Sequence, residues 1–174
     1  RDGAFGIKSI SFISDRTLTL LPSSARQKYQ QFIDEKALIV LPGSVLDISE
    51  VYYEIDREIE ARGYNPLVFG YDPYNAEVFV ELYIQHYASY GVDPVKQGVR
   101  TESVPLGEIK KLSEDRLLLF DERIFEFAMG NTMVLEDTNG NRKLYKRRYE
   151  NKIDPVSALL DAYVQYTRYP HMFA

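Results

Sequence analysis

The sequence predicts an α/β fold in which helices cover a mixed sheet. Short apolar segments of strand length alternate with longer segments whose apolar residues recur at helical spacing. An Asn-Gly turn between two further short segments, at Asn139 and Gly140, is typical of a β-hairpin. With 174 residues, of which 45% are hydrophobic, the chain can bury a sizeable core, and we expect one domain over residues 1–174.

The first part of the chain predicts two hairpin strands, a helix, a strand and a second helix. Apolar segments 7–13 and 17–21 flank Ser14-Asp15-Arg16, a pattern that favours an antiparallel hairpin. A helix at 23–34 and a strand at 37–41 follow. From Asp47 or Ser49 to Arg62, apolar residues recur at helical spacing, and Gly63 stands where a helix C-terminal cap is expected.

The rest of the chain alternates strands with helices. The run 67–71 is continuously apolar, as in a strand covered on both faces, and it ends at Asp72-Pro73. The predicted strands that follow are 93–98 and 117–120, with hairpin strands at 132–136 and 142–145; the predicted helices are 77–90, 104–114, 122–129 and 154–169.

The composition restricts the chemistry that the chain can perform. There is no Cys, which excludes disulfides and thiolate metal ligands. With two His and 26 acidic residues, any bound metal is expected to be a hard cation with oxygen ligands. No glycine-rich phosphate loop and no Gly-x-Ser-x-Gly elbow occur, which argues against nucleotide hydrolysis and serine-nucleophile schemes.

Two aspartates stand at positions suited to catalysis. Asp72 ends a predicted buried strand, and functional groups of open α/β sheets gather beyond the carboxyl ends of strands. Asp154 precedes Pro155 at the start of the last helix. Each also has an ordinary structural interpretation, because Asp-Pro starts turns and an aspartate before proline caps helices. A divalent cation between the two carboxylates would require this helix to pack against the end of the Asp72 strand.

A basic stretch follows the Asn-Gly turn. Six cations lie within the eleven residues 142–152, interleaved with two tyrosines, although the net charge of the chain is −5. This pattern favours an arm that contacts phosphate groups, and a solvated charged ribbon is the alternative. The predicted DNA-binding residues of this stretch are Lys143, Lys146, Arg147 and Arg148.

Several motifs, taken in order, resemble those of the C-terminal nuclease domain of terminase large subunits of tailed phages. The strand-end aspartate segment is similar to the family's, and so are the strand after it, a Met-x-x-Asn segment and a Lys-Ile-Asp segment that opens the final helix. Leu41–Ser44 also fits the family's strand followed by Pro-Gly. The four ordered segments are Val68–Ala76, Val95–Gly98, Phe127–Thr132 and Lys152–Leu159.

The resemblance implies a ribonuclease H-like mixed sheet flanked by helices, with an accessory β-hairpin near residues 132–146. It also implies that Asp72 and Asp154 are catalytic residues that help to bind two Mg²⁺ or Mn²⁺ ions. The family's first-strand aspartate is matched only by Asp2, or else it lies upstream. Lys152 is a candidate for contacting the scissile phosphate. Asp161 lies about 10 Å beyond Asp154 along the helix and is a reserve metal ligand.

The function that the resemblance implies is an endonuclease that cuts concatemeric double-stranded phage DNA during genome packaging. Its implied partners are DNA, an upstream ATPase domain absent from these residues, a small terminase subunit and the portal protein. No apolar run approaches the ~20 residues of a membrane span, so we expect a protein of the host cytoplasm. The alternative function is a non-catalytic module of the same fold that binds DNA or docks to the portal.

Overall fold

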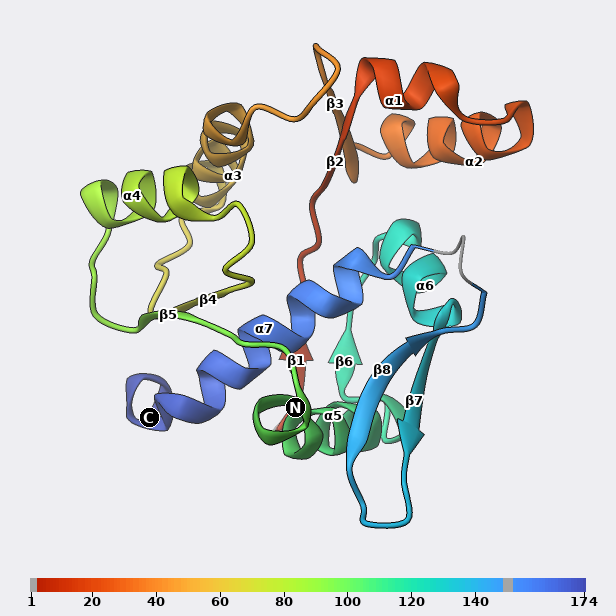
Figure 1. Cartoon of the computed structure of the whole chain (residues 1–174). Helices are drawn as coiled ribbons and strands as arrows, with labels where there is room; N and C mark the ends of the chain where they lie inside the picture. Colours follow the sequence, from red (N-terminus) through yellow and green to blue (C-terminus); the bar gives the residue numbers. More distant parts are fainter. Residues whose placement is uncertain (1–2, 149–151) are drawn as a thin grey trace.

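The computed structural model describes residues 3–148 and 152–174 and has the predicted α/β composition. Figure 1 shows helix α7 crossing the middle of the molecule, with the other elements around it. The helices are α1 (Asp15–Leu20), α2 (Ser23–Asp34), α3 (Ile48–Arg62), α4 (Glu77–His86), α5 (Val99–Glu114), α6 (Arg123–Gly130) and α7 (Asp154–Arg168), with a final 3₁₀ turn at Pro170–Phe173. The strands are β1 (Phe5–Gly6), β2 (Ser11–Ser14), β3 (Leu38–Leu41), β4 (Phe69–Tyr71), β5 (Val92–Pro94), β6 (Leu118–Leu119), β7 (Thr132–Glu136) and β8 (Arg142–Lys146).

Strand pairing is mixed, as predicted, but within the described residues it is divided among four two-stranded sheets. The pairs β1–β6, β2–β3 and β4–β5 are parallel, and β7–β8 is antiparallel. Parallel neighbours need a crossover between them, and α2 and α4 supply it for the second and third pairs.

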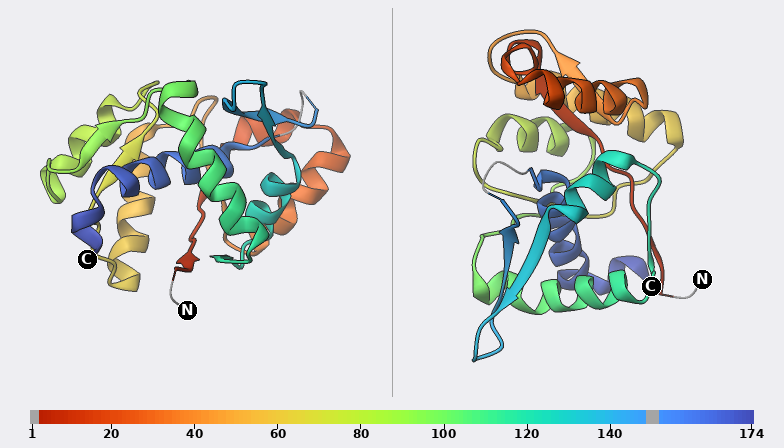
Figure 2. Two further views of the ribbon diagram at one scale, coloured as in Figure 1. Left: turned by 90° about the horizontal axis from the view of Figure 1, so that it is seen from below. Right: turned by 90° about the vertical axis from the view of Figure 1, so that its right-hand side faces the viewer.

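The main core forms where α7 meets its neighbours. Leu160 and Val164 of α7 are almost fully buried and pack against Leu106 and Ile109 of α5 and against Val95, which follows β5. The helix also packs against β4 and α6, and Figure 2 shows the molecule from two further sides. A smaller cluster of Phe32, Ala37, Leu38 and Ile124 holds the opposite end of the molecule together. No helix in residues 3–148 and 152–174 is long and apolar enough to cross a membrane.

Several predicted elements are confirmed with close boundaries. The Asp47 carboxylate accepts a hydrogen bond from the backbone N–H of Ser49 and caps α3, which ends at Gly63 with a left-handed φ of 65°. The predicted hairpin is present as β7 and β8, with Met133 opposite Tyr145 and Val134 opposite Leu144. Both features were encoded locally, by a capping side chain and by an Asn-Gly turn.

The predicted N-terminal hairpin is wrong. Residues 15–20 form helix α1, and β2 pairs in parallel with β3 instead of pairing with the segment after it. The cause is Ser14, whose side chain accepts a hydrogen bond from the backbone N–H of Thr17 at 3.2 Å and starts the helix. The alternating Thr-Leu pattern of residues 17–20 looks like a strand, but this cap determines the local structure.

Three boundaries in the middle of the chain also differ from the prediction. Helix α4 ends at His86 rather than Tyr90, because the chain turns there to lead into β5. Just before β5, the carbonyl oxygen of Gly91 accepts a hydrogen bond from the N–H of Phe69. Strand β5 covers only Val92–Pro94, whereas the predicted strand covered residues 93–98. Helix α5 begins at Val99 rather than Val104, since the Glu102 carboxylate accepts from the N–H of Gly98 at 3.0 Å and closes the first turn.

Candidate active site

Asp72 lies just beyond the carboxyl end of β4, where the sequence placed it. One carboxylate oxygen accepts a hydrogen bond from the backbone N–H of Tyr74 at 2.9 Å, and the other accepts from the side chain of Gln97 at 3.1 Å. The first bond is the turn interaction expected of an Asp-Pro sequence, so the structural interpretation of Asp72 is present. The second bond ties the carboxylate to the loop after β5 and fixes its direction.

Strand β4 approaches the middle of α7 closely because residue 70 is a glycine. A Cβ atom on Gly70 would lie 2.5 Å from the backbone carbonyl oxygen of Asp161 and 3.0 Å from Cβ of Gln165. A larger side chain would therefore separate strand from helix. The approach brings Asp72, two residues after Gly70, alongside the part of α7 that carries Asp161.

Asp161 is the carboxylate whose environment is most perturbed. It is half-buried, and no hydrogen bond in the described part of the chain engages its side chain. Burial, and after it the negative charges of Asp72 and Glu102, together raise the pKa of Asp161 to about 7. Three carboxylates from β4, α5 and α7 thus share one electrostatic environment. The reserve candidate Asp161 is thus an α7 aspartate whose pKa the charge of Asp72 helps to raise.

Asp154 lies at the start of α7, one heptad before Asp161. The residue that caps the helix is Ile153, and no side-chain capping bond is present, so Asp154 does not act as the helix cap. Tyr29 of α2 lies within reach of its charge, because burial and, after it, the charge of Asp154 raise the pKa of Tyr29. Among the described residues, no three acidic or histidine side chains come together closely enough to hold one metal ion. Asp2 lies outside the described residues.

Asn131 connects the hairpin to the start of α7. Its side-chain N–H donates to the backbone carbonyl of Lys152 at 3.1 Å, and its own carbonyl accepts from the N–H of Arg147 at 2.9 Å. Asn131 is buried, so both bonds are shielded from water. The basic end of β8 is thereby held beside Lys152, two residues before Asp154.

The predicted DNA-binding residues do not form one uniform surface. Lys143 is exposed on the outer face of the hairpin next to Tyr145, whereas Lys146 is partly buried on the alternate face. Arg147 and Arg148 are exposed and follow the strand. The hairpin itself is fixed against α5, because Ser103 Oγ accepts from the N–H of Arg142 at 2.9 Å and the Arg142 guanidinium covers Gly107.

Three residues of this region were not predicted from the sequence. Glu102 was placed before the predicted start of α5, and Gln97 carried no signal beyond its position in a motif. The capping pattern of Glu102 with Gly98 would have extended the helix and drawn attention to the carboxylate. Gln165, fully buried on α7, also went unnoticed; its amide donates to Gly91 O and to Asp93, each at 2.7 Å, and holds β5 against the helix.

Comparison with known proteins points to one family. The family model described as terminase large subunit, endonuclease domain, matches residues 1–168. The terminase large subunit of Lactococcus phage p2 is 23% identical over 142 residues, and that of Lactococcus phage SK1 is 22% identical over 143 residues. Each match covers 80% of this chain but only 26% of the relative, so the chain spans about a quarter of these proteins.

The fold has a solved counterpart. The crystal structure of the HK97 bacteriophage large terminase matches with a TM-score of 0.74 at 20% identity, over 88% of this chain and 32% of that one. This likeness confirms the α/β fold of the ribonuclease H-like class. Together with the family match over nearly the whole chain, it shows that the chain belongs to the family of terminase large subunit endonuclease domains.

Proposed function

We propose that this domain is a divalent-metal-dependent endonuclease that cuts concatemeric double-stranded DNA during phage genome packaging. The observation that carries the proposal is the close approach of β4 to α7 at Gly70, which brings Asp72 alongside the part of α7 that carries Asp161, in a domain of the terminase nuclease family. Carboxylates that crowd one another and raise a pKa are stabilised when a cation lies between them. The donor set is all oxygen, which suits Mg²⁺ or Mn²⁺.

The ligands that we propose for the metal ions are Asp72, Asp161 and Asp154, with Asp2 as a further candidate. Two bound ions would activate a water molecule and stabilise the leaving oxygen of the phosphodiester. In the reaction, the water would lose a proton to solvent as its oxygen bonds to phosphorus, the bond from phosphorus to the 3′ oxygen would break, and that oxygen would take up a proton, leaving a 5′-phosphate and a 3′-hydroxyl.

The protein groups around these carboxylates have supporting tasks. The N–H of Tyr74 and the Gln97 amide orient the Asp72 carboxylate. Asn131 holds the backbone of Lys152, two residues before Asp154, and the Lys152 ammonium group would contact the scissile phosphate. The exposed cations of the hairpin, foremost Lys143, Arg147 and Arg148, would contact the DNA backbone at sites away from the cut, with Lys146 in support.

The wider role follows the family and belongs to the same proposal. We expect the domain to act in the host cytoplasm, together with an ATPase domain, a small terminase subunit and the portal protein. The proposal does not need any sequence preference, because the candidate contacts are to phosphate groups.

Digestion of supercoiled plasmid tests the proposal. We expect linearisation or degradation with Mn²⁺ or Mg²⁺, none with chelator, and none with Asp72→Asn or Asp154→Asn. Asp115→Asn, an exposed aspartate at the end of α5, is the matched control and should cut normally. Intact plasmid with the folded parent protein, but retained DNA binding, would instead favour the non-catalytic module.

A further inference from the structure

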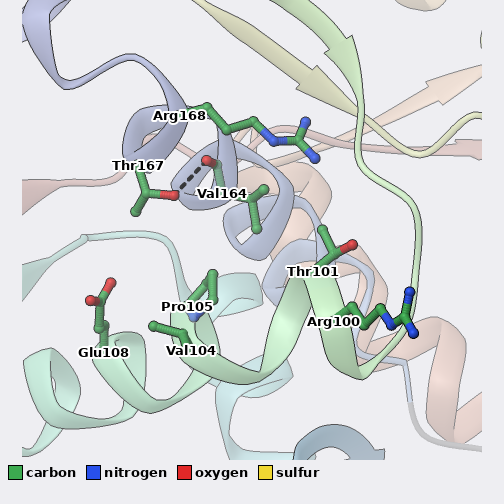
Figure 3. A pocket seen from close by; sticks show the side chains of 8 residues that line it. All are labelled: Arg100, Thr101, Val104, Pro105, Glu108, Val164, Thr167 and Arg168. Carbon is green, nitrogen blue, oxygen red and sulfur yellow. Dashed lines mark hydrogen bonds between the residues drawn. The ribbon is translucent and has the colours of Figure 1, made fainter.

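A cleft between the start of α5 and the end of α7 carries two arginines that the predicted site does not include. It has a volume of about 360 Å³, and Arg100 and Thr101 of α5 face Thr167 and Arg168 of α7 across it. Figure 3 shows both guanidinium groups extending to the same side, with the Thr101 hydroxyl between them in this view and Glu108 at the other side.

The charges in the cleft favour an anion. Neither Arg100 nor Arg168 forms an ion pair with any acidic residue of the described ranges 3–148 and 152–174. Arg168 is nevertheless held in place, because one guanidinium nitrogen donates to Pro94 O at 3.1 Å and to Gln165 Oε1 at 3.2 Å. A guanidinium offers five N–H donors, so most of its donors are left for a ligand.

The acidic residues near the cleft are engaged elsewhere. The Asp93 carboxylate, which feels the charge of Arg168, already accepts from Tyr169 Oη and from the Gln165 amide, each at 2.7 Å. Glu108 lies beside Tyr163 and helps to raise the pKa of that hydroxyl to about 12, although burial is the larger cause. The end of the cleft that holds Arg100 and Arg168 is therefore the positive end.

The position of the cleft relates it to the candidate active site. Arg168 follows Asp161 by seven residues on α7, a step of about 10 Å along the helix axis. Phosphates of one DNA strand advance by about 3.4 Å per nucleotide along the duplex, so 10 Å corresponds to about three nucleotides. Arg100 lies three residues after Gln97, which donates to Asp72. Both arginines thus lie one short step from the carboxylates.

We propose that Arg100, Thr101 and Arg168 bind a backbone phosphate of the DNA substrate about three nucleotides from the scissile bond. The planar guanidinium groups match the geometry of a phosphodiester, and a hydroxyl between them adds a third donor. This phosphate site rests on the proposed nuclease function and adds a contact on the side of α5 away from the hairpin. It would set the direction of the strand across the carboxylates without reading its sequence.

DNA binding by a nuclease-silenced protein tests the phosphate site. On an Asp72→Asn background, anisotropy of a fluorescent 30-base-pair duplex is measured between about 50 and 200 mM KCl for the parent and for Arg100→Ala/Arg168→Ala. We expect the double variant to bind about tenfold more weakly and to lose between about one and two units of the slope of log K against log salt. The matched control is Arg57→Ala/Lys111→Ala, which removes equal charge from exposed positions on α3 and α5 and should leave both values unchanged.

Two further variants keep the test independent of folding. Arg168→Ala removes two hydrogen bonds to the protein, whereas Arg100 makes no hydrogen bond within the described residues, so Arg100→Ala alone should lower the slope by about one unit without changing the Tm. Arg168→Lys should keep the slope but weaken binding, because it keeps the charge and loses the planar fork.

The outcomes separate this site from the nuclease function. If the arginine variants bind DNA like the parent while Asp72→Asn still abolishes cutting, the phosphate site is overturned and the nuclease stands. If plasmid cutting does not depend on Asp72, the nuclease proposal fails, and a retained slope change would still support a phosphate site. Equal loss of binding in the Arg57/Lys111 control would mean that DNA affinity depends only on the overall charge of the protein, and it would overturn the proposed phosphate site.

Discussion

The two halves of α7 carry opposite charges at the same spacing. Asp154 starts the helix, Asp161 lies at its middle and Arg168 closes it; each residue follows the previous one by seven positions and lies on nearly the same face. Asp161 is half-buried against β4, whereas Arg168 is exposed beside a cleft. One helix can therefore align the proposed cation site with the proposed phosphate site at a distance set by its rise per residue.

The burial of the two regions explains why they behave differently. Asp161 is half-buried, and burial together with the charges of Asp72 and Glu102 raises its pKa. Arg168 keeps contact with solvent and with Pro94 O, and a phosphate can replace part of its hydration shell. The acidic half should therefore control chemistry, and the basic half should control binding.

Removing the buried carboxylate should have the largest effect. Asp161→Asn is expected to lower Mn²⁺-dependent plasmid cutting by about 100-fold or more, because even residues that only orient metal ligands cost 10-fold to 100-fold when lost. DNA affinity at 100 mM salt should change little, since the substitution removes no phosphate contact. The measurement is single-turnover cleavage beside anisotropy. Normal cutting by Asp161→Asn would mean that this residue is a buried spectator.

Separating β4 from α7 should have the next largest effect. Gly70→Ala forces its new Cβ against the Asp161 backbone, which cannot rotate away, and should destabilise the fold by about 1–3 kcal/mol. Urea unfolding measures the change, and cleavage should fall as well. Gly130→Ala at the end of α6 is the matched control, because nothing lies within 4 Å of its Cβ position. An unchanged unfolding midpoint for Gly70→Ala would contradict the close approach.

The raised pKa of Asp161 gives a smaller effect with a definite sign. Because its pKa of about 7 exceeds the ordinary value of 3.8, the folded state binds more protons between these pH values. Its stabilising contribution is complete below about pH 4 and is lost as the pH rises through 7. In chelator, the Tm of the parent should therefore fall over this range more steeply than that of Asp161→Asn. Parallel curves would exclude a raised pKa at this residue.

A single change on the hairpin should have the smallest effect. Lys143→Ala should reduce the salt slope of DNA binding by about one unit and leave the cutting rate at saturating DNA unchanged. Lys36→Gln, on the turn between α2 and β3, provides a comparison far along the chain from the hairpin. A cutting defect in Lys143→Ala at saturating DNA would mean that the hairpin takes part in catalysis and not only in binding.

The elements that the sequence predicted well have strong local signals. Asp47 with Gly63 bounds α3, and the Asn139-Gly140 turn marks the hairpin, in each case through contacts between near neighbours. The N-terminal hairpin was wrong because a four-residue alternation is a weaker signal than the Ser14 cap. The division into two-stranded sheets depends on long-range pairing, which periodicity does not report.

The sequence predicted only those parts of the candidate site that carry a local signal. Asp72 stood out because it ends an apolar run, and Asp154 because of its motif. The partnership of Asp72 with Asp161 depends on Gly70, since only a residue without a side chain lets β4 reach the middle of the helix. Glu102 comes from α5 and Arg168 from the far end of α7, and their positions follow from packing of α5 on α7.

Binding of Mn²⁺ to the folded protein tests the central claim, that the Asp72–Asp161 apposition is a cation site, most directly. Thermal unfolding is followed in chelator and in rising Mn²⁺ for the parent, Asp72→Asn, Asp161→Asn and the control Asp115→Asn. The account predicts that Mn²⁺ raises the Tm of the parent and of the Asp115→Asn control and leaves the Tm of Asp72→Asn and Asp161→Asn unchanged. At a Mn²⁺ concentration of 100 times the Kd, the free energy of unfolding of the parent should rise by about 2.7 kcal/mol. Equal Mn²⁺ stabilisation of all four proteins, or of none, would contradict it.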